Sequence, residues 1–185
     1  MPSRHIFLFL FLCVSAVHFS QNLVDPKFTK ANYVIQPKSM VELNALDFSG
    51  KFTKVNGRVV MDLQTGTPTS FDLIIDISSL DLGIPGMTAH AKSSDYFDAT
   101  LYPAITFFGD SIIKQDSINY VVGMMTSKGI SISKAIPFMV QSYQGKNLKM
   151  KALFNIKRSE YNIGPVEDLS DEVAIEATLY AKKKD

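Results

Sequence analysis

Four residues in one short segment have the side chains of a hydrolytic site. His90 is followed by Ser93, Ser94 and Asp95, and residues three to five positions apart can be neighbours on a short helix. A working triad also needs an oxyanion hole that faces the base and the nucleophile. No Gly-x-Ser-x-Gly motif is present to supply one. We therefore favour a histidine that hydrogen-bonds at a helix end, and we expect a protein that is not an enzyme.

Acidic residues near the C-terminus form a second candidate cluster. Glu167, Asp168, Asp171 and Glu172 could bind calcium through their oxygens. Their spacing does not match the twelve-residue EF-hand loop, so a solvated loop is the favoured interpretation. The sequence also lacks the Gly-x-x-x-x-Gly-Lys-Ser/Thr pattern of a phosphate-binding loop. We expect neither a metal nor another cofactor.

The rarest reactive residue types gather at the N-terminus of this 185-residue chain of net charge +1. Cys13, the one cysteine, and two of the three histidines lie within the first twenty positions. The same stretch has a basic start at Arg4, an apolar run over residues 6–12 and small residues up to Ser20. This pattern predicts a secretory signal peptide over residues 1–20, followed by one domain over residues 21–185 that is periplasmic or secreted.

Removal of residues 1–20 takes away one of the 19 basic residues and leaves 18 basic against 18 acidic side chains, with no cysteine and one histidine. Disulfides, Cys/His metal sites and cysteine nucleophiles are then excluded. The even charge gives no reason to expect nucleic acid. An uncleaved membrane anchor is the main alternative, but the apolar stretch over residues 6–17 is shorter than the roughly 20 residues that span a bilayer. We do not expect an integral membrane protein, and a lipoprotein modified at Cys13 is less favoured still.

Period-two alternation of apolar and polar residues indicates an all-β domain. Apolar and polar residues alternate over residues 71–77, 148–157 and 172–179, which is typical of half-buried strands. Further strands are expected over 32–36, 41–48, 51–55, 58–63, 105–113, 118–125 and 136–143. About eight antiparallel strands can close into a barrel or stack as a sandwich, and the pattern alone does not choose.

Turn and helix signals separate these strands. Asn56-Gly57 is the strongest hairpin signal, because a type I′ turn needs positive φ at both central residues. Asp116-Ser117 and Gly145-Lys146-Asn147 predict further turns. The alternation lapses over residues 84–99 after a Pro-Gly start, which predicts one short helix near residues 85–98 that could cover one end of a barrel.

Large apolar residues share one face of each strand. This face predicts an interior of Met61, Leu63, Phe71, Leu73, Ile75, Phe107, Met124, Phe138, Met150, Phe154 and Ile175. Two interpretations stay open: a plain packed core, and a barrel too wide to fill itself that leaves a long apolar cavity for a lipid.

A series of motifs follows in order along the chain, over residues 48–52, 56–57, 77–83, 90–98, 102–107, 123–130 and 158–164. In order and spacing these motifs resemble those of the YceI family of bacterial periplasmic polyisoprenoid-binding proteins. The resemblance runs from about residue 28 to residue 181. It implies an eight-stranded antiparallel lipocalin-like barrel that holds an extended apolar lipid, such as a polyisoprenoid, an isoprenoid quinone or a fatty amide, as an exported carrier or store.

In this interpretation the apolar chain of the lipid contacts ten residues: Phe71, Leu73, Ile75, Phe97, Phe107, Met124, Phe138, Met150, Phe154 and Ile175. His90, Lys92 or Arg158 could contact a polar head group, although Arg158 could instead form an ion pair with a carboxylate such as Asp95. The alternative function is an exported stress-related barrel with a filled core that acts through surface contacts. Pairing of two chains into a homodimer is left open.

Overall fold

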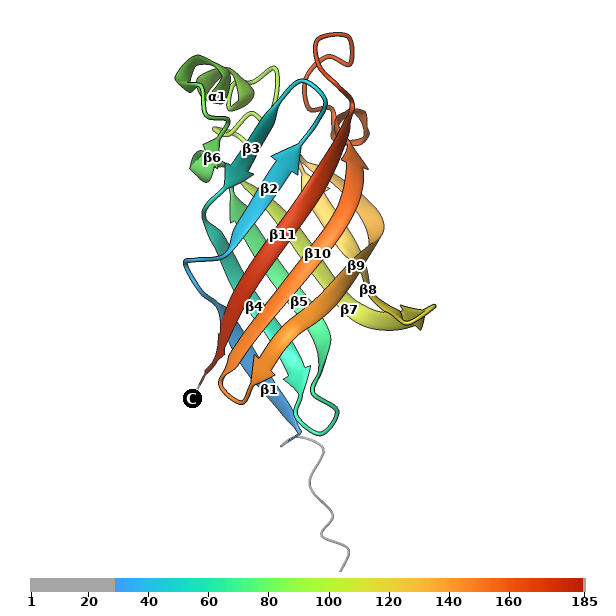
Figure 1. The fold of residues 1–185 in the computed structure, drawn as a ribbon. Helices are drawn as coiled ribbons and strands as arrows, with labels where there is room; N and C mark the ends of the chain where they lie inside the picture. Colours follow the sequence, from blue (N-terminus) through green and yellow to red (C-terminus); the bar gives the residue numbers. More distant parts are fainter. Residues whose placement is uncertain (1–28, 185) are drawn as a thin grey trace, which may run out of the picture.

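Antiparallel pairing runs from strand to strand around the whole domain (Figure 1). This computed structural model describes residues 29–184, so the expected signal peptide lies outside the described residues. The strands are β1 (Lys30–Ile35), β2 (Met40–Asn44), β3 (Ser49–Phe52), β4 (Val55–Asp62), β5 (Thr67–Asp76), β6 (Leu80–Asp81), β7 (Ala104–Gln115), β8 (Ile118–Ser127), β9 (Ile130–Gln144), β10 (Asn147–Lys157) and β11 (Glu172–Lys183). The short helical elements are η2 (Ile77–Ser79), α1 (Pro85–Ala91) and η3 (Arg158–Tyr161).

The sheet closes on itself because β11 pairs with β1 as well as with β10. The first half of β11 pairs with β2, and its last residues pair with β1. β1 and β2 thus occupy one strand position of the barrel. β4 pairs with β1 and β3 pairs with β2, so β3 and β4 share the next position. β5 pairs with β4 and β6 pairs with β3, so β5 and β6 share the position after that. The eleven segments therefore make a closed eight-stranded antiparallel barrel. The predicted fold class is confirmed.

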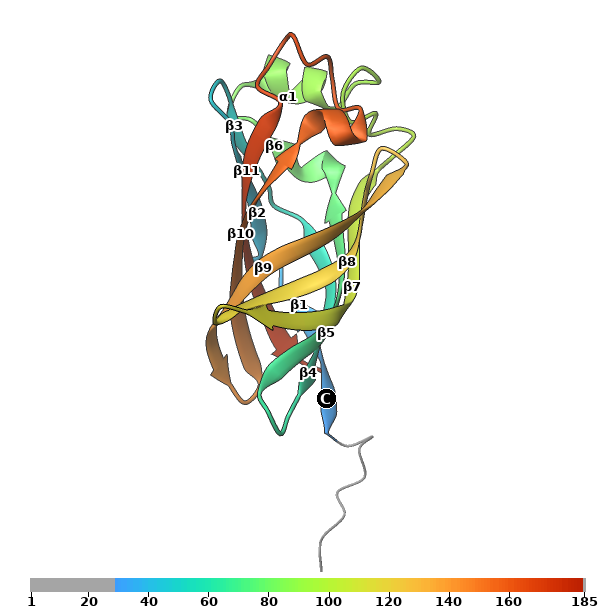
Figure 2. The same cartoon turned by 90° about the vertical axis from the view of Figure 1, so that its right-hand side faces the viewer.

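The two ends of the barrel differ. α1 and the connection between β10 and β11 lie at the end opposite the C-terminus, which we call the helix end (Figures 1 and 2). The opposite end is closed by buried side chains, which we call the floor: Tyr33, Val59, Met61 and Leu148. The Tyr33 hydroxyl also donates to the hydroxyl of Tyr143 at 3.2 Å. Met61, predicted as interior, is part of this floor, and Leu63 is half-buried against the core.

Two turn predictions are confirmed. Asp116 and Ser117 join β7 to β8 with φ values of 48° and 71°, and Gly145 has a φ of 54° between β9 and β10. The hairpin predicted at Asn56-Gly57 is wrong, because both residues lie inside β4. Gly57 has a φ of 122°, and a Cβ there would lie 1.9 Å from the Asp72 carbonyl oxygen. Its glycine permits a close approach of β4 to β5, not a reversal of the chain.

Other boundaries differ from the sequence prediction for local reasons. The strand expected over residues 41–48 ends at Asn44, where the chain turns and the Ala45 amide donates to the Phe48 carbonyl at 2.9 Å. The chain between β3 and β4 is interrupted at Thr53 and Lys54, whose amides donate to the Ser79 hydroxyl oxygen. A side chain thus replaces strand pairing at this bend.

The predicted short helix is present as α1. Pro85 is in its first turn, where a missing N–H costs nothing. The Leu82 amide donates to the Thr88 hydroxyl at 3.0 Å and fixes the chain before the helix. Residues 92–99 continue as turns beyond α1, so the helix covers only the first part of the predicted segment.

Candidate ligand-binding cavity

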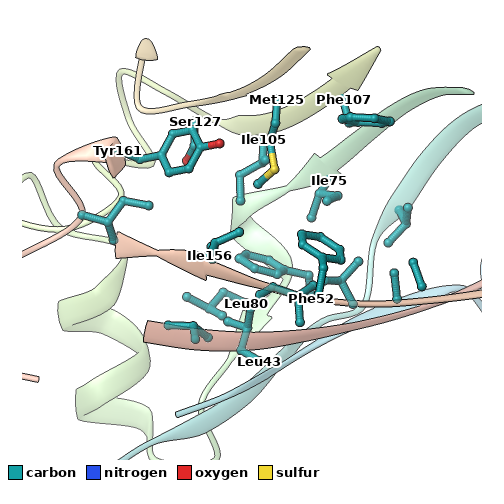
Figure 3. A pocket seen from close by; sticks show the side chains of 18 of the residues that line it. Leu43, Phe52, Ile75, Leu80, Ile105, Phe107, Met125, Ser127, Ile156 and Tyr161 are labelled. Carbon is teal, nitrogen blue, oxygen red and sulfur yellow. The ribbon is translucent and has the colours of Figure 1, made fainter. Parts of the chain in front are cut away.

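The barrel encloses an apolar cavity of about 180 Å³ between the floor and the helix end. Strands from all around the barrel line it, and Figure 3 shows part of this wall. Towards the floor, where Phe71 is opposite Val59 in the sheet, the rings of Phe71 and Phe138 meet edge to face with centroids 5.1 Å apart. Nine of the ten sequence-predicted lining residues lie on its wall: Phe71, Leu73, Ile75, Phe97, Phe107, Phe138, Met150, Phe154 and Ile175.

Small side chains on two neighbouring strands help to keep this space open. Ala152 of β10 and Ala177 of β11 are directly opposite each other in the ladder, and both line the cavity. An eight-stranded barrel is just wide enough for side chains to fill, so small residues inside it leave room for a ligand. At roughly 24 cal/mol per Å³, an empty cavity of 180 Å³ costs about 4 kcal/mol of folding free energy. A ligand that fills it would recover this cost.

Met124 is the one lining candidate that the structure places elsewhere. Its side chain is 45% exposed on the outer surface, opposite Phe108 of β7. Val121, Met125 and Ser127 of β8 line the cavity instead. Neighbouring residues of a strand point to opposite faces, so a one-residue error in register exchanges the two methionines. Two adjacent methionines give the sequence no means of choosing between them.

Three segments that lie far apart in the chain meet at the helix end. A Cβ on Gly164 would lie 2.3 Å from the ring of Tyr96, so only glycine lets the β10–β11 connection pack against that ring. The Lys128 ammonium group, at the turn between β8 and β9, donates to the Asn162 carbonyl at 2.8 Å. Together these contacts position the side chains that line the cavity nearest the helix end.

His90 lies at the helix end, on the wall of the cavity. Its imidazole meets the Tyr96 ring edge to face at 4.8 Å between centroids. The Ser93 amide donates to the carbonyl of His90 at 3.0 Å, which is a backbone contact and not a base–nucleophile pair. Lys92 does not line the cavity, and its ammonium group donates to the Ser78 carbonyl at 2.8 Å.

Arg158 lies on the cavity wall and has a structural role, but its partners are backbone carbonyls and not the predicted carboxylate. The side chain is 5% exposed, and its guanidinium donates to four backbone carbonyls, those of Ser170, Ile163, Pro165 and Leu169. These bonds hold the connection between β10 and β11 in place. These carbonyl contacts stand in place of the predicted ion pair with Asp95, and they use most of the N–H donors of the guanidinium.

Two of the acidic residues considered as calcium ligands form hydrogen bonds with the protein itself. The Asp171 carboxylate accepts from the amide and the hydroxyl of Ser159 at 2.7 and 2.8 Å, and these bonds hold the pKa of Asp171 below its ordinary value. The Glu172 carboxylate accepts from the Asn155 side chain at 2.7 Å. Within residues 29–184, no group of three or more His, Cys, Asp or Glu side chains is arranged to bind a metal ion.

The family comparison agrees with this geometry. A model of the YceI-like domain matches residues 24–181. The chain belongs to the YceI family. This family comprises binding proteins and is not known to include enzymes. The residues that form the helix end and the cavity wall all fall within the matched range.

Several solved structures share the barrel. BcnA of Burkholderia cenocepacia is 26% identical with a TM-score of 0.68, and the match covers 82% of this chain and 96% of that one. A YceI protein of Campylobacter jejuni is 21% identical with a TM-score of 0.69, covering 77% and 88%. A polyisoprenoid-binding domain of Saccharophagus degradans, implicated in plant cell wall breakdown, is 14% identical with a TM-score of 0.66, covering 83% and 99%. No curated protein matches the chain.

Two polar residues of this YceI cavity were missed by the sequence analysis. The hydroxyls of Ser127 and Tyr161 are buried and have no hydrogen-bond partner among the described residues, and both side chains line the cavity. Leaving a buried hydroxyl unsatisfied costs about 1–3 kcal/mol. Both residues belong to segments that carry the family resemblance, but a motif does not reveal which of its hydroxyls lacks a partner.

In the part of the chain that the structure covers, no helix has the length and apolarity needed to cross a bilayer.

Proposed function

We propose that this YceI protein is an exported carrier or store that holds an extended, uncharged lipid in its barrel. The observation that carries the proposal is the cavity itself: about 180 Å³ of space inside the barrel, walled almost wholly by apolar side chains. Such a wall selects for burial of hydrocarbon and against charge. A polyisoprenoid, an isoprenoid quinone and a fatty amide all have the required chain.

The energetics favour long apolar chains. Each five-carbon isoprene unit that leaves water gains roughly 4 kcal/mol at about 0.8 kcal/mol per carbon, before ordering costs are subtracted. Little polar recognition is then needed for tight binding. The name of the Saccharophagus degradans domain, which binds polyisoprenoid, supports this ligand class. A barrel acting only through its surface gains nothing from an internal cavity, so the alternative function is not favoured.

Export is part of the proposal and rests on the sequence. The basic start, the apolar run and the small residues within positions 1–20 predict that the barrel works in the periplasm or outside the cell. Cleavage is tested by the N-terminal sequence of protein purified from the exporting cell. Protein that retains Met1 and stays in the cytoplasm would contradict the export proposal without affecting the ligand proposal.

Mass spectrometry of the purified protein under native conditions tests lipid binding, with solvent extraction to identify the lipid. We expect a bound lipid, or uptake of an added isoprenoid quinone or fatty amide. Phe138→Asp places a carboxylate on the cavity wall and should abolish uptake. Met139→Asp is the matched control, because Phe138 is 6% exposed and the neighbouring Met139 is 52% exposed on the outer surface.

Circular dichroism establishes that both variants are folded. If Phe138→Asp does not fold, Phe138→Ala keeps the test open, because it removes wall contacts without adding charge and should weaken uptake. Wild-type protein that takes up no lipid, or a folded Phe138→Asp variant that binds like wild type, would overturn the proposed function.

A further inference from the structure

Two buried hydroxyls without a hydrogen-bond partner among the described residues belong to residues that line the cavity, and these residues come from different elements. In residues 29–184, three buried side-chain oxygens lack a hydrogen-bond partner, those of Ser93, Ser127 and Tyr161. Ser127 and Tyr161 line the cavity, whereas Ser93 does not. Buried polar groups in proteins are nearly always hydrogen-bonded, so an unpaired one on the wall of a binding cavity calls for an explanation. A ligand atom is the natural partner for both.

Ser127 and Tyr161 come from neighbouring parts of the helix end. Ser127 is the last residue of β8 and Tyr161 the last of η3. The contact between the Lys128 ammonium group and the Asn162 carbonyl, at 2.8 Å, joins the residues that follow them. Figure 3 labels both side chains at one end of the cavity, the same end as Met125 and Ile105. The two residues therefore line the same end of the cavity, where a polar head group would lie.

The protonation of Tyr161 makes it a donor. Burial, and secondarily the negative charge of Glu160, raise the pKa of its phenol to about 12. The phenol therefore keeps its proton throughout the physiological range and can donate to an acceptor. The hydroxyl of Ser127 can donate as well, since a serine hydroxyl carries one proton and two lone pairs.

The surrounding cations are already engaged with the protein. Lys128 donates to backbone carbonyls of Asn162 and Asp95. Lys134 pairs with Glu160 at 2.6 Å. The guanidinium of Arg158 donates to four carbonyls of its own loop. A phosphate or carboxylate buried here would have no cation of its own, which is costly, whereas a neutral oxygen needs only hydrogen bonds.

We propose that the hydroxyls of Tyr161 and Ser127 donate to one uncharged carbonyl oxygen of the ligand. The ligand then lies with its carbonyl at the helix end and its apolar chain directed towards the Tyr33 floor. A quinone or a fatty amide has such an oxygen, and a plain hydrocarbon does not. This inference rests on the proposed lipid-binding function and defines the head group and the orientation of the bound lipid.

Binding of a long-chain fatty amide and of a hydrocarbon of similar length tests the inference. Tyr161→Phe and Ser127→Ala each remove one oxygen and leave the apolar wall in place. Each should weaken amide binding about 5- to 10-fold, as expected for one hydrogen bond, and leave hydrocarbon binding unchanged. Tyr102→Phe is the matched control, because Tyr102 does not line the cavity. Equal binding of the amide by wild type and both variants, or an equal loss for the hydrocarbon, would overturn the inference.

Two further measurements exclude a merely structural role. The carbonyl stretch of a carbon-13-labelled amide should shift to lower frequency on binding to wild type, and part of that shift should be lost in Tyr161→Phe. The ligand-free Tyr161→Phe protein should melt no lower than wild type; a lower melting temperature would show that the fold itself uses the hydroxyl and would contradict the proposal.

The choice of ligands separates this inference from the proposed function. Failure of wild type to bind either ligand contradicts the carrier itself. Binding of the hydrocarbon with no dependence of amide binding on Tyr161 contradicts only the carbonyl site. A fatty acid that binds in its charged form as tightly as the amide, with the same dependence on Tyr161, would overturn the assignment to an uncharged head.

Discussion

Replacing Ala152 and Ala177 by leucine should fill the cavity from its own wall. The two residues face each other across β10 and β11 and both line the cavity. Each substitution adds three carbon atoms, so the double variant buries six more. At about 0.8 kcal/mol per carbon this gains at most roughly 5 kcal/mol. Imperfect fit in a preformed space takes back about 1–3 kcal/mol.

We therefore expect the ligand-free double variant to be more stable than wild type by about 2 kcal/mol. For a domain of this size the melting temperature should rise by roughly 4–8 °C. Lipid affinity should fall at least about 100-fold, because the added carbons occupy space that the ligand needs. A stabilising change that abolishes binding is the behaviour of a cavity kept open for a ligand.

Thermal unfolding of delipidated protein and titration with a fatty amide measure the two effects. Ala174→Leu is the matched control: it makes the same substitution on β11 at an exposed position. It should change neither the melting temperature by more than about 1–2 °C nor the affinity. A folded double variant that binds lipid as tightly as wild type would refute the reasoning, because the ligand could not then occupy this cavity.

Two other predictions concern the connection between β10 and β11. Arg158→Lys should destabilise the protein by about 3 kcal/mol in urea unfolding, because one ammonium group cannot reach all four carbonyls that the planar guanidinium contacts. The control is Arg58→Lys at an exposed position, which should change the free energy of unfolding by less than about 0.5 kcal/mol. Asp171→Asn tests the pH dependence: the lowered pKa of Asp171 means that its stabilising contribution is present above about pH 4 and is lost as the pH falls through the folded-state value. Melting temperatures measured between about pH 6 and 3 should therefore fall less steeply for the variant, and parallel profiles would contradict this role of the carboxylate.

Local patterns account for the parts of the fold that were predicted correctly. Period-two alternation depends only on neighbours in the chain, so the inward faces of β5, β10 and β11 could be read directly from the sequence. The turns at Asp116-Ser117 and Gly145 depend equally on local backbone preference. The motifs that resemble the YceI family supplied the choice between a barrel and a sandwich.

Local patterns failed where a distant segment decided the outcome. Asn56-Gly57 has the composition of a tight turn, but the approach of the Asp72 carbonyl makes Gly57 part of a strand. The inward face of β8 depends on its register against β7 and β9, so Met125 and not Met124 lines the cavity. The role of Arg158 depends on the path of the loop that its own hydrogen bonds hold.

The sequence by itself determined an all-β chain, the inward face of most strands and the family to which the motifs belong. Only the tertiary structure decided that the interior is hollow, because the enclosed volume depends on how many strands close the barrel and on which small residues meet across it. It also brought Ser127 and Tyr161 together at one end of the cavity, as two hydroxyls without a partner in the described chain. The two residues are more than thirty positions apart in the chain. Their meeting at one end of the cavity depends on how two distant segments pack, which no local sequence pattern predicts.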